Sequence, residues 1–240
     1  MKKSYLNWSS GKDAALALYE LQKEGKFSVE KLVTTINSET NQISMHGVRT
    51  ELLLRQAKSI GIPLYAISLN GNVSLSDYNL KMTEAVKDLK SQNMTHSIFG
   101  DIFLEDLREY REKELNKVGI EAVFPLWKRD SSKLIEVFLE AGFKAITVCV
   151  NSKFLDKSYC GKVIDKEFLA SLPDGVDPCG ENGEFHTFVF DGPIFKEPVK
   201  FEVGEVVEKF YTPSSSKDDC FKEEETSWDT AFWYCDLLPI

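Results

Sequence analysis

The sequence predicts an α/β fold in which a Rossmann-like parallel sheet is followed by a smaller C-terminal α+β part. Short apolar runs alternate with helical stretches from residue 3 to about 150, which is typical of parallel strands joined by right-handed crossovers. After about residue 126 the pattern changes, and strand-like segments with Gly-Pro punctuation follow. Hydrophobic residues make up 42% and charged residues 28% of the 240-residue chain, as in globular proteins. We therefore expect one domain over residues 1–125 and a second over residues 126–240.

The strands and helices follow from these patterns. Apolar runs predict strands at Ser4–Trp8, Lys31–Ile36, Pro63–Leu69, Ser97–Phe99, Ala122–Phe124 and Ala145–Val150. Apolar residues at helical spacing predict helices at 13–24, 48–60, 75–92, 104–118 and 131–141. Gly25 and Gly61 are placed to end the first two helices, and Ser74 and Ser131 are candidate N-caps.

The last third of the chain is expected to contain further strands. Segments 187–190 and 199–207 have strand character, and the run 230–240, "TAFWYCDLLPI", is expected to dock as another strand. The polar stretch 212–227, "TPSSSKDDCFKEEETS", predicts a surface loop. Trp228, Phe232 and Trp233 are expected to pack in the core.

Charge and composition exclude several classes of protein. A net charge of −9 and a pI near 5.0 argue against a general nucleic-acid binder, which needs a basic face. The sequence lacks the run of about 18 apolar residues that a membrane span requires, and polar residues interrupt any signal-peptide core near the start. Five cysteines without a CxxC pair predict reduced thiols. We expect a cytoplasmic protein, and a homodimer is compatible with the sequence.

The stretch "LNWSSGKDAALALYEL", residues 6–21, places small residues and a lysine between the first strand and the first helix. A bare backbone, a positive charge and a helix N-terminus together suit a phosphate group. Walker A is excluded, because Leu6 stands where its first glycine would be and Asp13 follows the lysine. The G-x-G-x-x-G pattern is excluded because Gly11 is the only glycine in this stretch. The alternative is a serine-rich helix cap with Lys12 in solvent.

Residues 9–14, "SSGKDA", resemble the PP-loop S-G-G-x-D-S of the N-type ATP pyrophosphatases, which cleave ATP between the α- and β-phosphates. Ser10 replaces the first glycine, and it fits only with a negative φ or with strain. Ala14 replaces the final serine, which removes one phosphate or metal contact. The resemblance implies ATP as the cofactor, bound by Ser9, Ser10, Gly11, Lys12, Asp13 and Ala14.

Three more segments appear in the order and spacing of the diphthine–ammonia ligase family, which the chain resembles. They are "FGDIFLEDLREYREKE" (99–114), "PLWKRD" (125–130) and "VDPCGENGEFHTFVFDGP" (176–193). Residues 45–64 resemble the bacterial-type branch of that family. The resemblance covers residues 4 to about 200. It implies a PP-loop ATPase domain of the HUP type (the α-hydrolase-like fold), followed by a smaller substrate domain.

The crevice at the carboxyl ends of the strands is the expected nucleotide site. Gly100 and Asp101 end the fourth strand there, so Asp101 together with Asp13 is a candidate to hold Mg²⁺. Asn37 and His46 follow the second strand, near the expected position of the adenosine, where His46 is either a ligand contact or a surface residue.

Arg108 and Arg111 stand at i and i+3 on a predicted helix and share one face. They either pair with Glu105 or Glu112, or bind phosphate or a substrate carboxylate. With Trp127 of the "PLW" segment, they are predicted to contact the substrate.

The segment "VDPCGENGEFHT", residues 176–187, brings acidic residues and a histidine together with closely spaced glycines. Carboxylates and an imidazole in a tight loop suit Mg²⁺ binding, deprotonation of an attacking amine, or retention of a cationic nucleophile. We expect Gly180, Asn182, Gly183 and Thr187 to bind substrate. With the PP-loop pair Lys12 and Asp13, the predicted catalytic residues are Glu181, Glu184 and His186. The alternative is an ordinary turn with surface acids and a solvent-facing histidine.

These observations predict an ATP-dependent, AMP-forming ligase that adenylates a carboxylate and amidates it with ammonia, using ATP and Mg²⁺. The carboxylate, on a protein or a small molecule, is not identified by the sequence, and diphthamide synthesis is left open. One alternative is a nucleotide-binding regulatory protein with little turnover, which Ser10 and Ala14 favour. Another is a PP-loop enzyme of tRNA thiolation, which requires a reactive thiolate at Cys149, Cys160 or Cys179 and a nucleic-acid partner.

Overall fold

The computed structural model describes residues 1–43, 46–71, 73–211 and 230–240. The loop expected at 212–227 and the core position expected for Trp228 lie outside these residues. In chain order the N-terminal elements are β1 Lys2–Asn7, α1 Lys12–Glu24, β2 Phe27–Asn37, β3 Gln42–Ile43, α2 Thr50–Ile60, β4 Leu64–Leu69, α3 Leu75–Ser91, β5 His96–Ile98, α4 Glu105–Lys117 and β6 Glu121–Val123. The later elements are α5 Ser131–Glu140, β7 Lys144–Asn151, the 3₁₀ turn η1 Lys157–Tyr159, α6 Lys166–Ser171, β8 Phe185–Asp191, β9 Phe201–Tyr211 and β10 Thr230–Pro239.

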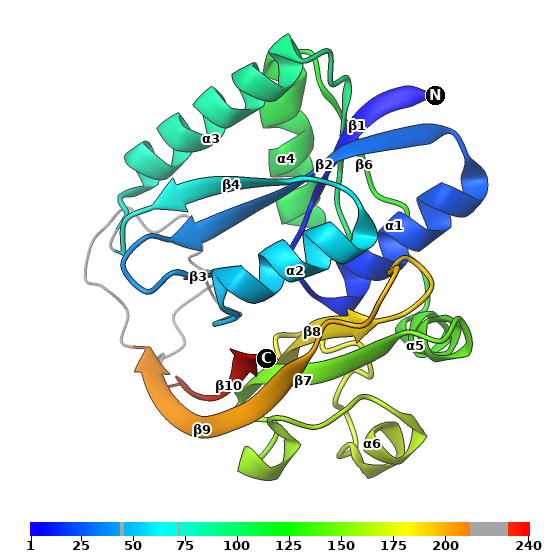
Figure 1. The fold of residues 1–240 in the computed structure, drawn as a ribbon, viewed down its shortest axis with the longest axis vertical. Coiled ribbons are helices and arrows are strands. Elements are labelled where there is room, and N and C mark those ends of the chain that lie inside the picture. The colour runs from blue at the N-terminus through cyan, green and yellow to red at the C-terminus, as the bar shows by residue number, and fades with distance from the viewer. Residues whose placement is uncertain (44–45, 72, 212–229) are drawn as a thin grey trace.

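Within the described residues, six strands form a mostly parallel sheet, shown in the upper half of Figure 1. β1 pairs in parallel with β2 on one side and with β5 on the other. β4 continues the sheet beyond β2, and β6 continues it beyond β5, while short β3 lies antiparallel to the end of β2. The direction of winding therefore reverses at β1, which places the ligand crevice at the carboxyl ends of β1 and β5.

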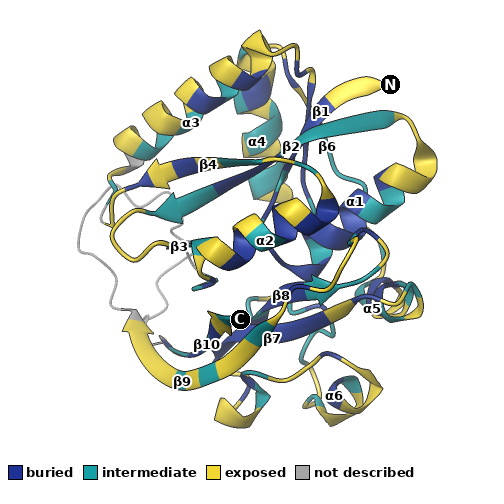
Figure 2. Ribbon diagram, in the orientation of Figure 1, coloured by how far each residue is buried: buried dark blue, intermediate teal, exposed yellow. Residues whose placement is uncertain are grey.

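The two faces of this sheet are covered by different elements because successive strand residues point to opposite faces. Leu6 and Leu32 belong to a buried cluster with α1 and α2, whereas their neighbours Tyr5 and Val33 belong to a second cluster with α3 and α4. Figure 2 shows the helices buried toward the sheet and exposed on their outer faces. In the described residues no helix is both long and apolar enough to cross a membrane.

A second, antiparallel sheet of four strands in the order β8-β7-β10-β9 lies in the lower half of Figure 1. The predicted fold class, a parallel α/β part followed by a smaller C-terminal part, is confirmed. The run expected to dock at 230–240 becomes β10, which pairs with both β7 and β9. The predicted strand at Ala145–Val150 forms β7 in this antiparallel sheet, because a short buried apolar run looks the same in either kind of sheet.

Other differences are local. β3, η1 and α6 were not predicted, because each is too short for a periodic pattern to identify. Ser74 caps α3 as expected, since its hydroxyl accepts from the Asp77 N–H. The N-cap of α5 is Asp130 instead of Ser131, because the Asp130 carboxylate accepts from the Lys133 N–H at 3.0 Å.

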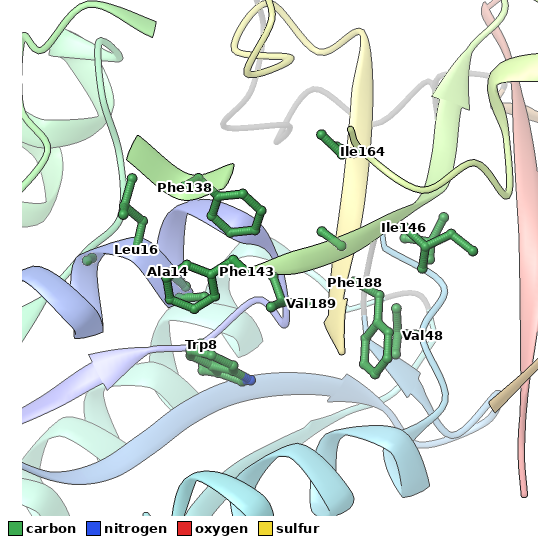
Figure 3. Packing of buried hydrophobic residues seen from close by; sticks show 14 of the residues in the cluster. Trp8, Ala14, Leu16, Val48, Phe138, Phe143, Ile146, Ile164, Phe188 and Val189 are labelled. Atoms are coloured by element: carbon green, nitrogen blue, oxygen red, sulfur yellow. The ribbon is translucent and has the colours of Figure 1, made fainter. Parts of the chain in front are cut away.

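α1 and α2 lie between the two sheets, and one buried cluster runs from Leu6 and Trp8 across these helices to Phe188 and Val189 of β8 (Figure 3). The expected boundary between residues 125 and 126 stays a prediction, since the cluster joins both parts. At its centre lies the fully buried Gln56 side chain of α2.

The Gln56 amide joins three parts of the chain. Its oxygen accepts from the Trp8 indole N–H at 2.9 Å, and its nitrogen donates to the Ser10 carbonyl at 3.2 Å and to the Val189 carbonyl at 2.6 Å. A buried amide is stable only with its hydrogen bonds made. Gln56 therefore fixes the segment after β1 relative to α2 and β8.

Replacement of Gln56 by leucine is expected to lower the free energy of unfolding by about 2–4 kcal/mol, because the Trp8 N–H and the Val189 carbonyl lose a partner inside the core. The measurement is urea unfolding followed by circular dichroism. Gln92→Leu is the matched control: this amide is exposed and donates to Asp88 at 3.2 Å, so a change within about 0.5 kcal/mol is expected. Equal effects of the two substitutions would contradict the role of the Gln56 amide.

Candidate functional site

The segment between β1 and α1 forms a tight loop whose backbone is held from the core side. Ser10 has a φ of 71°, a left-handed conformation that residues with a Cβ rarely adopt. Its carbonyl accepts from the Val189 N–H at 2.9 Å as well as from Gln56. Its side chain is buried and its hydroxyl has no hydrogen-bond partner in the described residues. The sequence allowed a serine here with either a negative φ or backbone strain, and the positive φ shows that the strained conformation is adopted.

Lys12, the first residue of α1, is only 4% exposed, so the alternative of a solvent-facing lysine is wrong. Its ammonium lies 2.8 Å from both carboxylate oxygens of Asp13 and 5.9 Å from the ring centroid of Phe185. Burial by itself would lower the pKa of Lys12, but the carboxylate of Asp13 and nearby acidic groups outweigh it and raise the pKa above its usual range. The N-terminus of α1 therefore carries a buried lysine in its charged form.

Thr187, predicted to bind substrate, lies directly against this loop. Its hydroxyl oxygen accepts from the Lys12 backbone N–H at 3.0 Å. A Cβ on Gly11 would lie 3.3 Å from both the carbonyl and the hydroxyl oxygen of Thr187, which explains the glycine. The loop is thus completed by β8, a strand of the C-terminal sheet.

Gly100 brings the end of β5 against the start of α1. A Cβ on Gly100 would lie 2.8 Å from the Ala14 nitrogen and from the Asp13 carbonyl carbon, closer than a side chain tolerates. The next residue, Asp101, forms an ion pair with Arg111. Burial raises the pKa of Asp101 despite this partner.

Asp13 and Asp101 supply oxygen donors, the type that Mg²⁺ prefers. Each carboxylate is paired with a cation, Lys12 or Arg111 respectively. The described residues contain no cluster of three or more potential metal ligands. The two carboxylates fit a cation that receives its other ligands from a bound phosphate and from water.

The acidic loop between α6 and β8 is organised around Glu184, which is 1% exposed. Its carboxylate accepts from the backbone N–H groups of Asp177 and Asn182, at 3.0 and 2.8 Å, and from the Asn182 amide at 3.0 Å. Gly180 has a φ of 72°, and a Cβ there would lie 2.8 Å from the Phe185 carbonyl. Gly183 has a φ of 80°. Glu184 therefore holds the loop together, and the alternative of surface acids does not apply to it.

Glu181 is the half-buried carboxyl group of this loop, and its side chain has no hydrogen-bond donor in the described residues. Burial raises the pKa of Glu181 to about 8, and the neighbouring Asp13 raises it further than Lys12 lowers it. Burial and Asp13 thus favour the protonated form of this carboxyl group. The Lys12 ammonium lies 5.9 Å from the ring centroid of Phe185, the residue that follows Glu184, so the acidic loop lies beside the PP-loop.

His186 stacks on His46, with ring centroids 4.4 Å apart and an angle of 27° between the rings. Burial, with a smaller effect of Lys12, lowers the pKa of His186 to about 4. Burial also lowers the pKa of His46 well below its usual value, and His46 Nδ1 has no partner in the described residues. Both rings are therefore neutral at pH 7, and the alternative of a solvent-facing His186 does not hold.

The remaining predicted residues lie at two other places. Arg108 is stacked on Trp127, with 4.6 Å between the guanidinium carbon and the ring centroid, so these two predicted residues do meet. Asn37 ends β2, where its side-chain oxygen accepts from the N–H groups of Glu39 and Thr40 at 2.9 and 3.3 Å. Asn37 thus stabilises a turn at the end of its strand.

The described cysteines are buried thiols. Burial raises the pKa of Cys149 and of Cys179 to about 12 and that of Cys235 to about 11, and it raises the pKa of Cys160 as well. Such groups are neutral and poor nucleophiles at pH 7. The fifth cysteine, Cys220, lies outside the described residues.

Two residues of the site were missed by the sequence analysis. Gln56 and Trp8 support the loop from behind, yet each looks ordinary in sequence: a polar residue in a helix and an aromatic residue after a strand. The available signal was that Gln56 follows Leu52 and Leu53 at helical spacing, on the buried face of α2.

The fold and this loop define a class of protein: an α/β protein with a loop of a kind suited to a phosphate group at the switch point of a parallel sheet. The chain belongs to the diphthamide synthase family. Residues 1–122 match the family's N-terminal domain, described as "Diphthamide synthase N-terminal domain", and residues 130–237 match the "Diphthamide synthase C-terminal domain".

Curated relatives are similar at low identity. The diphthine–ammonia ligase of Bos taurus is 27% identical over 63% of this chain and 62% of its own length. That of Homo sapiens is 26% identical over 63% of this chain and 62% of its own length. The Schizosaccharomyces pombe enzyme is 26% identical over 84% of this chain but only 36% of its own length. The chain thus spans less than two thirds of the length of each of these relatives.

Replacement of Ser10 by glycine is expected to stabilise the protein by about 1–2 kcal/mol, because it removes left-handed strain and a buried hydroxyl without a partner. The free energy of unfolding in urea measures this. Asn93→Gly is the control: Asn93 also has a positive φ, 66°, but it is exposed and asparagine tolerates this conformation. A loss of stability in Ser10→Gly would show that the hydroxyl contributes to the folded state.

The lowered pKa of His186 predicts a pH dependence of stability. The folded pKa of about 4 lies below the ordinary value of 6.5, so as pH falls the unfolded chain takes up the proton first and the folded state loses stability between pH 6.5 and 4. His186→Phe keeps a stacked ring but removes this proton. We expect wild type to lose up to about 1.4 kcal/mol more than the variant per pH unit in that window. Parallel unfolding free energies of the two proteins from pH 7 to 5 would contradict the shift.

Proposed function

We propose that this protein is an ATP-dependent, AMP-forming ligase that converts a substrate carboxylate into an amide with ammonia. The carboxylate oxygen attacks the α-phosphorus of ATP, which gives an acyl-adenylate and releases pyrophosphate. Ammonia then attacks the acyl carbon, loses a proton and expels AMP. The observation that carries the proposal is the buried Lys12 at the N-terminus of α1, in a loop anchored at the switch point of the sheet. Membership in the diphthamide synthase family supports it.

The PP-loop supplies the electrostatic part of this chemistry. The first backbone N–H groups of α1 have no acceptor within the helix, and together with the Lys12 ammonium they stabilise the charge on the departing pyrophosphate. Lys12 is paired with Asp13, so phosphate oxygens compete with this carboxylate for the ammonium. Ser9, Ser10, Gly11 and Ala14 complete the backbone around the phosphates.

Asp13 and Asp101 are the residues that would hold Mg²⁺ at this site. When bound, the cation neutralises charge on the phosphate oxygens. Gly100 sets the close approach of the two carboxylate-bearing segments, because it packs directly against the backbone of Asp13.

Residues 126–240 supply the acceptor side in this proposal, through the acidic loop. Glu181 faces the PP-loop and has a raised pKa near 8, so it can exchange a proton with the attacking amine near neutral pH. Neutral His186 can accept a hydrogen bond from ammonia. We assign Glu184 the holding of the loop, because its carboxylate already binds three N–H donors. Gly180, Asn182 and Gly183 shape the same loop.

A second candidate function is a nucleotide-binding regulatory protein with little turnover. The strained Ser10, with its hydroxyl unpartnered in the described residues, and the missing hydroxyl at Ala14 favour it. tRNA thiolation has less support, since the described thiols are buried and protonated and the chain is acidic. The matched relatives are named for diphthine; the carboxylate that this chain uses is a separate question.

The test is chromatography of ATP products after incubation with Mg²⁺, ammonium and an extract of small molecules and proteins. We expect AMP and pyrophosphate from wild type, and a decrease of about 100-fold or more in Lys12→Ala, because a buried charge at the phosphates is lost. Lys117→Ala removes an exposed lysine of α4 and should leave the rate unchanged. Intact ATP with binding retained, or ADP as the product, would favour the regulatory protein.

A further inference from the structure

Three aromatic side chains form a shelf at the carboxyl ends of β5 and β6. Phe99 follows β5, Phe124 follows β6, and Trp127 lies in the turn beyond. The rings of Phe99 and Phe124 are stacked with centroids 5.2 Å apart, and those of Phe124 and Trp127 are 5.6 Å apart at an angle of 59°. We call Phe99, Phe124 and Trp127 the aromatic shelf.

Arg108 lies over this shelf. Its guanidinium carbon is 5.1 Å from the Phe124 ring centroid and 4.6 Å from that of Trp127. Its Nε donates to Glu112 at 2.7 Å. The two ring contacts and the Nε bond to Glu112 restrict the position of the guanidinium, and they leave its two terminal nitrogens available. In the described residues these terminal nitrogens have no acceptor, and the side chain is 32% exposed.

The other cations near the shelf differ from Arg108 in this respect. Arg111 lies over Phe99 at 4.4 Å, but its terminal nitrogen is bound to Asp101. Lys128 lies 6.0 Å from the Trp127 centroid and pairs with Glu105. Among these three cations, Arg108 alone combines contacts to two aromatic rings with terminal donors that have no acceptor in the described residues.

Arg108 is also on the correct side of the molecule. It belongs to the first turns of α4, which begins at the carboxyl end of β5. One turn later, Arg111 binds Asp101, next to the glycine that packs against the start of α1. Arg108 therefore lies on the same helix as the Asp101 ion pair, about one turn before Arg111, near the carboxyl end of β5.

We propose that the terminal nitrogens of Arg108 bind the carboxylate of the substrate, while the aromatic shelf and Glu112 hold the guanidinium in place. A planar carboxylate matches two parallel N–H donors of arginine, which lysine cannot reproduce. The PP-loop with Lys12 already provides for the phosphates of a nucleotide, so a separate receptor at the edge of the crevice suits the second reactant. The identity of the anion rests on the proposed function, whereas the existence of the receptor does not.

The test is a titration of the ¹⁵N-labelled full chain, observed by NMR at the arginine side-chain N–H groups, with sodium acetate as the probe. Sodium chloride keeps the ionic strength constant. We expect saturable shifts of the Arg108 signals, which are assigned by their loss in Arg108→Lys. In that variant, acetate binding detected at the Trp127 indole N–H should be about tenfold weaker, a loss of one charge-assisted bond. Lys117→Gln on the same helix should bind acetate as wild type does.

Three outcomes would overturn the proposal: equal shifts with chloride alone, unchanged acetate binding in Arg108→Lys, or tighter binding of inorganic phosphate than of acetate when both are observed at the Arg108 signals. The last result would assign Arg108 to the nucleotide phosphates. Unchanged Arg111 signals in Arg108→Lys verify that the shelf is intact. The titration uses no ATP, so its outcome is independent of the test of the proposed function. Acetate binding without AMP formation would contradict the proposed function and support the carboxylate receptor. AMP formation without acetate binding would support the proposed function and contradict the receptor.

Discussion

The hydrogen bonds of one buried side-chain amide support both sheets and the loop between them. Gln56 binds the Trp8 indole, the Ser10 carbonyl and the Val189 carbonyl, and it is fully buried. An unpaired amide in the core would cost free energy, so Gln56 must keep these hydrogen bonds. The position of the loop after β1 is therefore fixed by the packing of α2 against β8. The PP-loop is therefore not a feature of the parallel sheet alone. Its conformation depends on a strand of the C-terminal sheet, and Thr187 on that strand accepts from Lys12 as well.

Around this loop, cations and acids are paired in a way that defines the chemistry available. Lys12 forms an ion pair with Asp13, and Arg111 forms one with Asp101. In this acidic protein, both cations of the crevice are therefore already paired with a carboxylate. An anionic ligand must compete for these cations, and a divalent cation for the carboxylates. Glu181, with no cationic partner of its own in the described residues, is instead held near its protonated form by burial and by Asp13. In the proposed reaction, the same crevice supplies charge for phosphates and a group that exchanges a proton with ammonia.

Much of the fold could be predicted because it is encoded locally. Alternation of apolar runs and helical stretches predicted the parallel sheet, and Ser74 capped its helix as expected. β7 was predicted as a strand, yet its place in the antiparallel sheet was not, since pairing depends on β8 and β10, which lie far along the chain. Short elements such as β3 were missed because two residues carry no period.

For the site, the sequence by itself determined the chemistry-bearing residues: the small residues and lysine at 9–14, the carboxylate after β5, and the acidic, glycine-rich loop near residue 180. Each group lies within a short segment, so its residue types and spacing can be recognised from the sequence. Only the tertiary structure decided which of these side chains already have hydrogen-bond or ion-pair partners within the protein. In the fold, the ring of His46 stacks on that of His186, and the Thr187 hydroxyl accepts a hydrogen bond from the PP-loop. The Glu184 carboxylate is surrounded by N–H donors. The physical reason is that the partners of His186 and of the Lys12 backbone come from segments more than a hundred residues away, whereas the donors to Glu184 are near in sequence and converge only in the folded loop. Burial and such partners decide whether a charged group binds a ligand or holds the fold.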